Sequence, residues 1–368
     1  MTDAPHGSIA LAAGGTGGHM FPAEALAQEL KRRGRSVILI TDDRGARYTG
    51  NFPADEQIEI SAASPNVGGI IAKAFAAVSI AAGLIKSLIA LRQRNIVAAV
   101  GFGGYPSFTA MKAAALLKIP YGVHEQNGVL GRANRQLVGD AKFIAHAFPV
   151  LEKVPTRVRE RLAEVGNPVR DAVMAKQSTP MPPLGASEPI TILIFGGSQG
   201  ASLFSEIAPK SLASLPSNLR TRLRIVHQAR ESELDQVRKI YDDVAIDNEV
   251  APFFDDLPSR IADAGLVIAR AGASTVTELS IIGRPSILVP LAIAMDDHQT
   301  GNARVLSEAG GAILLPEKEF TETSLANALS PLLSDPNQLT VLASNAAERV
   351  RDRATMELAN MVEEIAGA

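Results

Sequence analysis

The sequence contains no cysteine, and this absence excludes several chemistries. Disulfides, cysteine-ligated metal clusters and thiol nucleophiles cannot be built from this chain, and its composition is compatible with a reducing compartment. Histidine is also scarce, with six in 368 residues. Any catalysis therefore has to use histidine, carboxylates and backbone groups.

Aromatic residues are few, with no tryptophan, four tyrosines and twelve phenylalanines. Proteins that bind single-stranded nucleic acid stack its bases on aromatic side chains. We therefore expect no nucleic-acid partner.

Long hydrophobic runs are missing as well. The most hydrophobic stretch spans residues 68–91, but within it only 12 residues separate Lys73 from Lys86. A helix that crosses a bilayer needs roughly 18 to 20 apolar residues. The first residues also lack the basic segment and apolar core of a signal peptide. We expect neither a membrane span nor a secretion signal.

Charge is unevenly distributed between the two halves of the chain. The whole sequence has a net charge of −3, from 36 Lys and Arg against 39 Asp and Glu. Residues 1–170 carry 20 basic and 13 acidic side chains (+7), whereas residues 171–368 carry 16 and 26 (−10). This asymmetry favours an anionic partner for the first half.

Apolar runs that end in glycine or polar residues alternate with helical patterns, which is typical of α/β architecture with parallel sheets. Strands are expected at residues 8–13, 37–41, 96–100, 121–124, 143–145, 190–195, 223–227, 266–269 and 286–290, and the first helix at residues 22–33.

The chain is expected to form two domains. Residues 166–189, rich in Pro, Ser and Gly, predict a linker, after which the order of strand, Gly-rich turn and helix begins again. We therefore expect two doubly wound, Rossmann-like domains facing each other across a cleft, at residues 1–168 and 169–349. A charged helical pattern at residues 344–365 predicts a C-terminal helix, and we expect residues 350–368 to pack back on the first domain.

The first Gly-rich loop, AGGTGGHMFP at residues 13–22, lies between a predicted strand and a predicted helix. Glycines there let the backbone approach a ligand, and a helix N-terminus offers unpaired N–H groups to an anion. The loop is not a dinucleotide fingerprint, because Met20 stands where the third glycine is needed, and no P-loop GK[ST] is present. An anion-binding loop and a purely structural turn both fit.

His19 stands at the end of this loop. A helix N-terminus disfavours a protonated imidazole, so His19 would be neutral and able to accept a proton near pH 7. A capping histidine without a catalytic role is the alternative.

Two further polar loops follow predicted strands of the first half, GFGGYPS at residues 101–107 and HEQNGVLGRAN at residues 124–134. Ligands of open α/β sheets bind at the carboxyl ends of the strands. We therefore expect Glu125, Gln126 and Asn127 to lie at the same edge as the first loop.

The second half repeats this arrangement. FGGSQGAS places Ser198 at a helix start that suits a phosphate, and residues 273–275 form another. Glu278, one turn later, either accepts hydrogen bonds from a ribose or is an ordinary exposed charge. Asp296, Asp297 and His298 are adjacent in one loop and are poorly placed to share a metal ion.

Seven segments together resemble one family. In order they are AGGTGGHMFP, GFGGYPS, HEQNGVLGRAN, VGNPVR, GGSQGA, RAGASTVTEL and DDHQTGNA. They resemble, across nearly the full length, the MurG-type UDP-N-acetylglucosamine transferases of bacterial peptidoglycan synthesis, in glycosyltransferase family 28. The resemblance implies a GT-B fold whose C-terminal domain holds the sugar nucleotide. It also implies an inverting hexosyltransferase that moves GlcNAc from UDP-GlcNAc to the C4 hydroxyl of MurNAc in lipid I. The product, lipid II, serves cell-wall biogenesis, cell shape and division.

The same resemblance assigns binding residues. Phe254 would flank uracil through its backbone and Gln299 would contact the sugar. His298 stands where the family often has Gln, so its role is open. The resemblance assigns donor binding to Thr16, Gly17, Gly18, Asn127, Arg170, Ser198, Phe254, Ala273, Ser274, Thr275, Val276, Thr277, Glu278 and Gln299, and acceptor binding to Gly103, Gly104 and Tyr105.

Inverting transfer needs a base for the acceptor hydroxyl and stabilisation of the departing UDP. His19 is the first candidate for the base and Glu125 the second. Helix N-termini, with Arg170 nearby, would stabilise the diphosphate. We therefore expect that neither a metal nor another cofactor is required.

Residues 68–91 have two interpretations. Ile71, Phe75, Val78, Ile85 and Leu88 share one helical face, and basic residues lie close by. Such a helix would dip into anionic lipid, whereas core burial is the alternative. With lipid I as acceptor, the first interpretation implies peripheral attachment to the cytoplasmic face of the inner membrane. Other cell-wall synthesis proteins are possible partners there. The basic residues are Lys73, Lys86, Arg92 and Arg94.

Other functions are kept as alternatives. A different GT-B enzyme, such as a UDP-GlcNAc 2-epimerase or a glycolipid glycosyltransferase, would share the Gly-rich loops, and so would a non-catalytic nucleotide-sugar binding module. The failed dinucleotide fingerprint disfavours a nicotinamide oxidoreductase. HEQN together with GGTGGH favours the lipid I acceptor.

Overall fold

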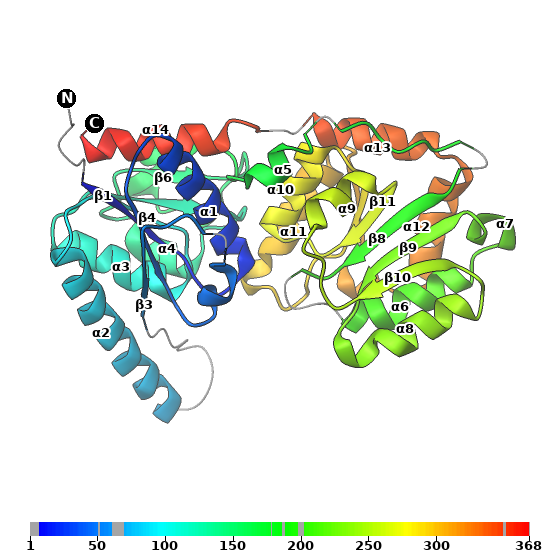
Figure 1. Ribbon diagram of the computed structural model, residues 1–368, viewed down its shortest axis with the longest axis horizontal. Coiled ribbons are helices and arrows are strands. Elements are labelled where there is room, and N and C mark those ends of the chain that lie inside the picture. Colours follow the sequence, from blue (N-terminus) through cyan, green and yellow to red (C-terminus); the bar gives the residue numbers. More distant parts are fainter. Residues whose placement is uncertain are drawn as a thin grey trace. The chain divides into compact units, whose positions relative to one another are not determined.

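The computed structural model describes residues 7–50, 52–60, 70–177, 179–185, 188–197, 202–348 and 351–367, with side chains except at residues 48, 70–76 and 295. Its contacts divide the chain into two compact units, residues 1–170 with 351–368, and residues 171–350. Each unit contains a parallel sheet with helices on both faces, which confirms the doubly wound α/β class (Figure 1).

The sheet of the first unit has the strand order β3-β2-β1-β4-β5-β6-β7, and every pair is parallel. The order reverses direction between β1 and β4, which is the switch point where open α/β sheets bind ligands. The strands are β1 (Ser8–Ala12), β2 (Val37–Thr41), β3 (Glu56–Glu59), β4 (Ile96–Gly101), β5 (Tyr121–Glu125), β6 (Ile144–His146) and β7 (Leu162–Glu164). The helices are α1 (Gly17–Arg32), α2 (Ile70–Arg92), α3 (Gly104–Leu116), α4 (Arg132–Leu137) and α14 (Ala354–Ala366), with 3₁₀ turns η1 (Gly45–Tyr48) and η2 (Thr156–Arg161).

Alternation along β1 divides the core of the first unit into two layers. Ile9 and Leu11 pack in a cluster with α1 and α14, whereas Ala10 and Ala12 face the cluster that includes α3. Successive strand residues point to opposite faces of a sheet, so a strand covered on both sides must be apolar throughout. This explains why β1 reads as a continuous apolar run.

Helix α1 begins five residues earlier than predicted. The carbonyl of Thr16 accepts the N–H groups of His19 and Met20, at 3.1 and 3.2 Å, so helical geometry starts at Gly17. The expected start at Pro22 is wrong, because one proline early in a helix removes only one backbone hydrogen bond. His19 therefore lies in the first helical turn and not in the loop.

The second unit has the strand order β10-β9-β8-β11-β12-β13, again with all pairs parallel. The edge strand β10, like β3 in the first unit, escaped prediction because its outward residues are polar. The strands are β8 (Ile190–Phe195), β9 (Leu223–Gln228), β10 (Asp247–Ala251), β11 (Leu266–Ala269), β12 (Ser286–Leu288) and β13 (Ala312–Leu314). The helices are α5 (Asp171–Met174), α6 (Ser202–Ala213), α7 (Ser217–Arg220), α8 (Leu234–Asp242), α9 (Leu257–Asp263), α10 (Ala273–Ile282), α11 (His298–Ser307), α12 (Glu322–Ser334) and α13 (Asn337–Ala347), with 3₁₀ turns η3 (Glu231–Glu233), η4 (Met295–Asp297) and η5 (Glu317–Glu319).

Part of the predicted linker is tied to the second unit. The buried guanidinium of Arg284 donates hydrogen bonds to the carbonyls of Thr179 and Pro180, at 2.9 to 3.2 Å. It also donates to Ala262, so it joins this segment to α9. The lack of helix and strand patterns predicted a linker here. The buried Arg284 nevertheless fixes this segment by binding its backbone carbonyls, although the segment has no helix or strand.

The predicted single helix at residues 344–365 is wrong, because the structure has α13 and α14 there. The apolar face of α13 packs in the second unit, while Leu358, Ala359 and Val362 of α14 belong to the core of the first. A continuous helix could not bury both faces in different cores.

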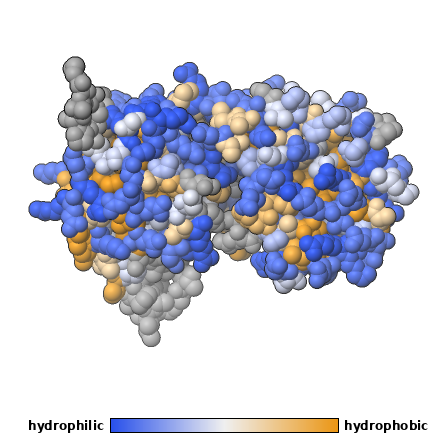
Figure 2. Space-filling view, viewed as in Figure 1, coloured by the Kyte–Doolittle hydropathy of each residue, from blue (hydrophilic) through white to orange (hydrophobic). Residues whose placement is uncertain are grey.

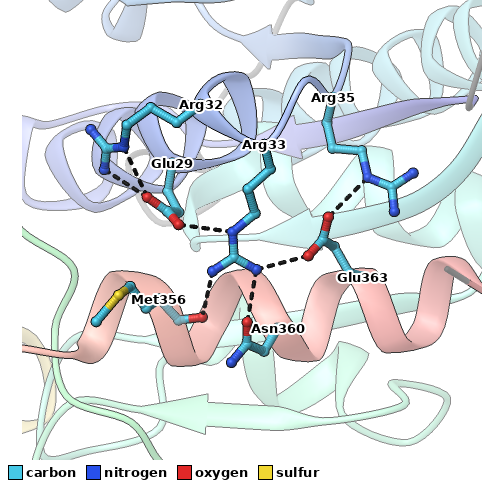
Figure 3. Close-up of polar contacts among 7 residues, drawn as sticks. All are labelled: Glu29, Arg32, Arg33, Arg35, Met356, Asn360 and Glu363. Carbon is cyan, nitrogen blue, oxygen red and sulfur yellow. Dashed lines mark hydrogen bonds and ion pairs between the residues drawn. The ribbon is translucent and has the colours of Figure 1, made fainter.

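Ion pairs attach α14 to the first unit (Figure 3). Arg33, after the end of α1, donates to Asn360 and Glu363, both at 2.7 Å, and to the carbonyl of Met356. Arg35 donates to the second oxygen of Glu363 at 3.0 Å. The last helix is therefore part of the first unit through both its apolar and its polar face.

Candidate functional site

The carboxyl ends of β1, β4 and β5 lie side by side at the switch point of the first sheet. The loops that follow these strands carry the first Gly-rich segment, the Gly103–Gly104 turn and the HEQN segment. The parallel order therefore brings together three segments that are separate in the chain, at residues 13–22, 101–107 and 124–134.

Asp42 fixes the first Gly-rich loop. Its carboxylate accepts the N–H groups of Gly15 and Gly45, both at 2.9 Å, and pairs with Arg44 at 2.9 Å. Asp42 is fully buried at the end of β2. Sequence reasoning missed this role; its position directly after the strand next to β1 was the available signal.

The turn at Gly103 and Gly104 packs tightly against the first loop and His19. A Cβ on Gly103 would lie 2.9 Å from Cε1 of His19, and a Cβ on Gly104 would lie 3.1 Å from the carbonyl oxygen of Gly14. Gly103 also has φ +97°, a conformation that disfavours other residues. Gly103 is therefore required for the close approach of the turn to His19, and Gly104 for its close approach to the first loop.

The imidazole of His19 is held by Gln126. Its Nδ1 lies 3.0 Å from Oε1 of Gln126, which is itself 1% exposed. His19 remains partly exposed at the start of α1. The site thus presents one half-buried imidazole with a fixed orientation.

Glu125 is occupied by hydrogen bonds. One carboxylate oxygen accepts from the backbone and side-chain nitrogens of Asn127, at 3.2 and 3.1 Å, and the other from Gly131 and Asn134, at 2.9 and 2.8 Å. The side chain is 2% exposed. Four donors on a buried carboxylate organise the loop and leave little capacity for proton transfer.

Arg170, which ends the N-terminal segment of the first unit, lies next to the start of α1. Its guanidinium stacks over the ring of Phe21 with 3.9 Å to the ring centroid. A Cβ on Gly17 would lie 2.9 Å from the same ring. The stack therefore places a cation close to the first turn of α1, and Phe21 is a site residue that the sequence did not suggest.

In the second unit, α10 begins directly after β11, with Gly272 as its N-cap. The carbonyl of Ala271 accepts a hydrogen bond from Asn302 of α11 at 3.1 Å, which ties the two helices together. Glu278 is 5% exposed, so its interpretation as an exposed charge is wrong. Ala273, Ser274, Thr275, Val276 and Thr277 all lie in the first turns of α10.

The remaining predicted residues of the second unit are distributed over neighbouring segments. Oε1 of Gln299 accepts the N–H of Leu291 at 3.0 Å, so this side chain holds the turn after β12. Phe254 is buried beneath Arg260, at 4.2 Å to the ring centroid, so only its backbone is available. Ser198 lies outside the described residues.

The segment with Asp296, Asp297 and His298 forms a tight turn. Asp296 and Asp297 have φ of 58° and 55°, and Thr300 donates to Asp297 at 2.7 Å. Within the described ranges, no group of three His, Asp or Glu side chains is arranged to hold a metal ion.

Family models match both halves of the chain. The glycosyltransferase family 28 N-terminal domain matches residues 9–146, and the glycosyltransferase family 28 C-terminal domain matches residues 191–360. The chain belongs to glycosyltransferase family 28. This membership confirms the resemblance, and the protein is a hexosyltransferase of that family.

Curated relatives in the family extend over nearly the whole chain. A protein of Caulobacter vibrioides strain NA1000 is 45% identical over 97% of this chain and 98% of its own length. One of Rhodospirillum centenum is 46% identical over 98% of this chain and 94% of its own. Both are named UDP-N-acetylglucosamine--N-acetylmuramyl-(pentapeptide) pyrophosphoryl-undecaprenol N-acetylglucosamine transferase.

Solved structures agree with the family assignment. The crystal structure of Acinetobacter baumannii MurG has a TM-score of 0.77 and 29% identity, covering 97% of this chain and 99% of its own, and it confirms the GT-B fold class. A UDP-GlcNAc 2-epimerase of Neisseria meningitidis has a TM-score of 0.66 at 14% identity, covering 97% and 100%. The second likeness concerns the fold alone.

Proposed function

We propose that this family 28 enzyme transfers GlcNAc from UDP-GlcNAc to the C4 hydroxyl of MurNAc in lipid I, with inversion at the anomeric carbon, to form lipid II. The observation that carries the proposal is the similarity of 45% over 97% of the chain to a relative that bears this name. The product makes it an enzyme of peptidoglycan synthesis, with roles in cell shape and division.

His19 is proposed as the base. In this step its Nε2 takes the proton of the acceptor hydroxyl, the oxygen forms a bond to the anomeric carbon, and the bond to the UDP oxygen breaks with its electron pair leaving on UDP. His19 is supported over Glu125 because it is partly exposed and makes one side-chain hydrogen bond, whereas Glu125 is buried beneath four donors.

The leaving diphosphate is proposed to be stabilised by backbone N–H groups and by Arg170. The first turn of α1, with Thr16, Gly17 and Gly18, has N–H groups that point out of the helix, and Arg170 is stacked beside it on Phe21. Such preorganised donors lower the cost of charge that develops in the transition state. We expect that turnover needs no metal or cofactor and therefore persists in EDTA.

Donor and acceptor binding are proposed for different segments. The start of α10, from Ala273 to Glu278, with Ser198, Phe254 and Gln299, is proposed to bind the nucleotide and sugar, and Asn127 the sugar from the first unit. Gly103, Gly104 and Tyr105 at the start of α3 are proposed for the acceptor. A domain division at residues 168 and 349 between acceptor and donor functions is part of this proposal.

The first unit is further proposed to attach to the anionic, cytoplasmic surface of the inner membrane through α2. The side chains of Val78, Ile85 and Ile89 are 68%, 58% and 51% exposed, at spacings that place them on one helical face. Figure 1 shows α2 projecting from the rest of its unit, and Figure 2 shows hydrophobic surface on the coloured part of this helix. Ile71, Lys73 and Phe75 have side chains outside the description, and Leu88 packs on the core and not outward.

None of the helices in the described residues is long and apolar enough to span a membrane. An interfacial helix needs only one apolar face and nearby basic side chains. Lys86 and Arg92, both exposed, meet that second need. Partners among other cell-wall synthesis proteins remain a prediction.

The deciding experiment incubates the protein with UDP-GlcNAc and a lipid I analogue, with and without EDTA. UDP release that depends on the acceptor, together with a disaccharide product, supports the proposal. Formation of ManNAc without acceptor would indicate an epimerase, and binding of UDP-GlcNAc without turnover would indicate a sensor.

The variant His19→Ala tests the base. We expect turnover to fall by roughly 10² to 10⁴. The affinity for UDP-GlcNAc, measured by calorimetry, should stay within about twofold because the imidazole acts on the acceptor. Near-normal turnover in a folded variant would transfer the role to Glu125 or to no single residue.

A further inference from the structure

The position of Gln126 between two histidines allows the proton on His19 to be located. Nε2 of Gln126 lies 3.0 Å from the backbone carbonyl oxygen of His124, which can only accept a hydrogen bond. That contact requires the nitrogen of the amide at this position. Its oxygen then faces Nδ1 of His19 at 3.0 Å, so Nδ1 must carry a hydrogen.

The contacts of the His124 ring give the same orientation of the Gln126 amide. Nε2 of His124 lies 2.9 Å from the carbonyl oxygen of Gly166, so this nitrogen is the protonated one. Burial lowers the pKa of His124 to about 4, and the neutral ring therefore has a lone pair on Nδ1. That lone pair accepts the second amide hydrogen of Gln126 at 3.1 Å.

Two backbone carbonyls, those of Gly166 and His124, anchor this series of hydrogen bonds. Gly166 follows β7, and its N–H donates to the carbonyl of His146 on β6. His124 lies in β5 and is fully buried, and the side chain of Gln126 is 1% exposed. Rotation of the Gln126 amide would place two acceptors against each other at the His124 carbonyl, which a buried site does not tolerate.

We propose that Gln126 is a positioning residue that holds His19 in the Nδ1-protonated tautomer and so leaves Nε2 with its lone pair for the acceptor hydroxyl. In the described part of the chain, no group hydrogen-bonds to Nε2 of His19. The inference rests on the proposed role of His19, because a base needs an unprotonated nitrogen directed at the substrate. In other enzymes a histidine held in the wrong tautomer loses most of its catalytic power while the geometry is kept.

The tautomer is measured by two-bond ¹H–¹⁵N correlation NMR of protein labelled with ¹⁵N-histidine at neutral pH, with His19→Ala to assign the signal. We expect a pyrrole-type Nδ1 and a pyridine-type Nε2 for His19, and the reverse for His124. An Nε2-protonated His19 in the unmodified protein would overturn the proposal. This readout needs no catalysis, so it is independent of whether His19 proves to be the base.

The variant Gln126→Leu removes all three amide contacts, one to His19 and two to His124, at similar volume. We expect mixed tautomers for His19 and a fall in kcat of about 10- to 100-fold, with the KM for UDP-GlcNAc within twofold. Gln57→Leu, an exposed site on β3, is the matched control and should change neither. The signals of His227 in the second unit provide an internal check that the fold is kept. An unchanged His19 tautomer in folded Gln126→Leu would contradict the proposal.

A double-variant cycle separates positioning from a general structural role. If Gln126 acts through His19, then Gln126→Leu should cost nothing further in a His19→Ala background. Multiplied effects of the two substitutions would show that Gln126 acts elsewhere and would overturn the proposal. Normal turnover of His19→Ala would instead reject the base, while the NMR result stood by itself.

Discussion

The geometry around His19 is produced by small residues as much as by polar ones. Gly103 lets the α3 turn approach the imidazole, and Gln126 fixes the ring from the other side. A catalytic side chain has to be held within a fraction of an ångström, and here the fixed neighbours are a glycine turn and a buried amide. Substitution of Gly103 therefore tests the position of His19 without removing it.

Gly103→Ala should lower kcat by roughly 10- to 100-fold, because its Cβ would meet Cε1 of His19 at 2.9 Å and displace the ring. The matched control is Gly34→Ala, which has φ +76° and nothing within 4 Å of the added Cβ. Both variants should lose about 1 kcal/mol of stability from backbone strain. Steady-state kinetics with a lipid I analogue make the comparison, and equal kcat in the two variants would show that the ring is not displaced.

At the same scale, the HEQN segment illustrates what a sequence leaves open. The residue types indicated a site, but they did not reveal that Glu125 organises the loop or that Gln126 contacts His19. Those roles depend on the direction in which each side chain points at the end of β5. Pairs of residues more than 100 positions apart meet only after the sheet has formed.

At the scale of elements, α2 exposes three large apolar side chains on one face, those of Val78, Ile85 and Ile89. Ile85→Asp combined with Ile89→Asp should abolish co-sedimentation with anionic phospholipid vesicles, because a charge at the interface opposes insertion of that face. Val341→Asp on α13 is the matched control, since this side chain is also exposed, at 59%. Circular dichroism checks the fold. Unchanged vesicle binding in the folded double variant would assign the exposed face another role.

Helix α14 provides a stability test for the first unit. Burial acts to raise the pKa of Glu363, but hydrogen bonds from Arg33 and Arg35 outweigh it, and the pKa lies below its ordinary value of 4.5. The stabilisation is therefore present above pH 4.5 and is lost as the pH falls through the lowered pKa. Glu363→Gln should cost about 1 to 2 kcal/mol of unfolding free energy at pH 7, measured by urea denaturation, and progressively less as the pH falls through the lowered pKa.

The matched control for this variant is Glu322→Gln in the second unit. Its ion pair with Lys210 is about half exposed on both sides and should contribute little. Equal losses for Glu363→Gln and Glu322→Gln at pH 7 would mean that the ion pairs in Figure 3 do not attach α14.

At the scale of the whole molecule, each unit contains one fully buried neutral histidine. Burial lowers the pKa of His124 to about 4 and that of His227 to about 3. Below pH 6.5 the unfolded chain takes up protons that the folded chain does not, so stability falls as the pH drops from 6.5 toward the folded values.

Between pH 7.5 and pH 5 each buried histidine should cost about 2 kcal/mol of unfolding free energy, ahead of any loss from carboxylates such as Glu363. Urea denaturation of the full chain at the two pH values measures the change. His227→Gln should remove the part that belongs to the second unit. Denaturation midpoints that do not move between pH 7.5 and pH 5 would contradict the prediction.

The sequence by itself determined the alternating pattern with its buried interior strands, the two Gly-rich openings and the family. These features are local: buried parallel strands need continuous apolar runs, and close turns need glycine. The zero count of cysteine likewise restricted the proposed chemistry to a histidine, backbone N–H groups and an arginine.

Only the tertiary structure decided which residues act together. It divided residues 344–365 between two cores, placed Arg170 on Phe21, enclosed Glu125 among four donors and located the proton of His19 through Gln126. Each of these depends on contacts between segments that are distant in the chain. Such contacts follow from sheet order and side-chain direction, which composition and periodicity do not contain.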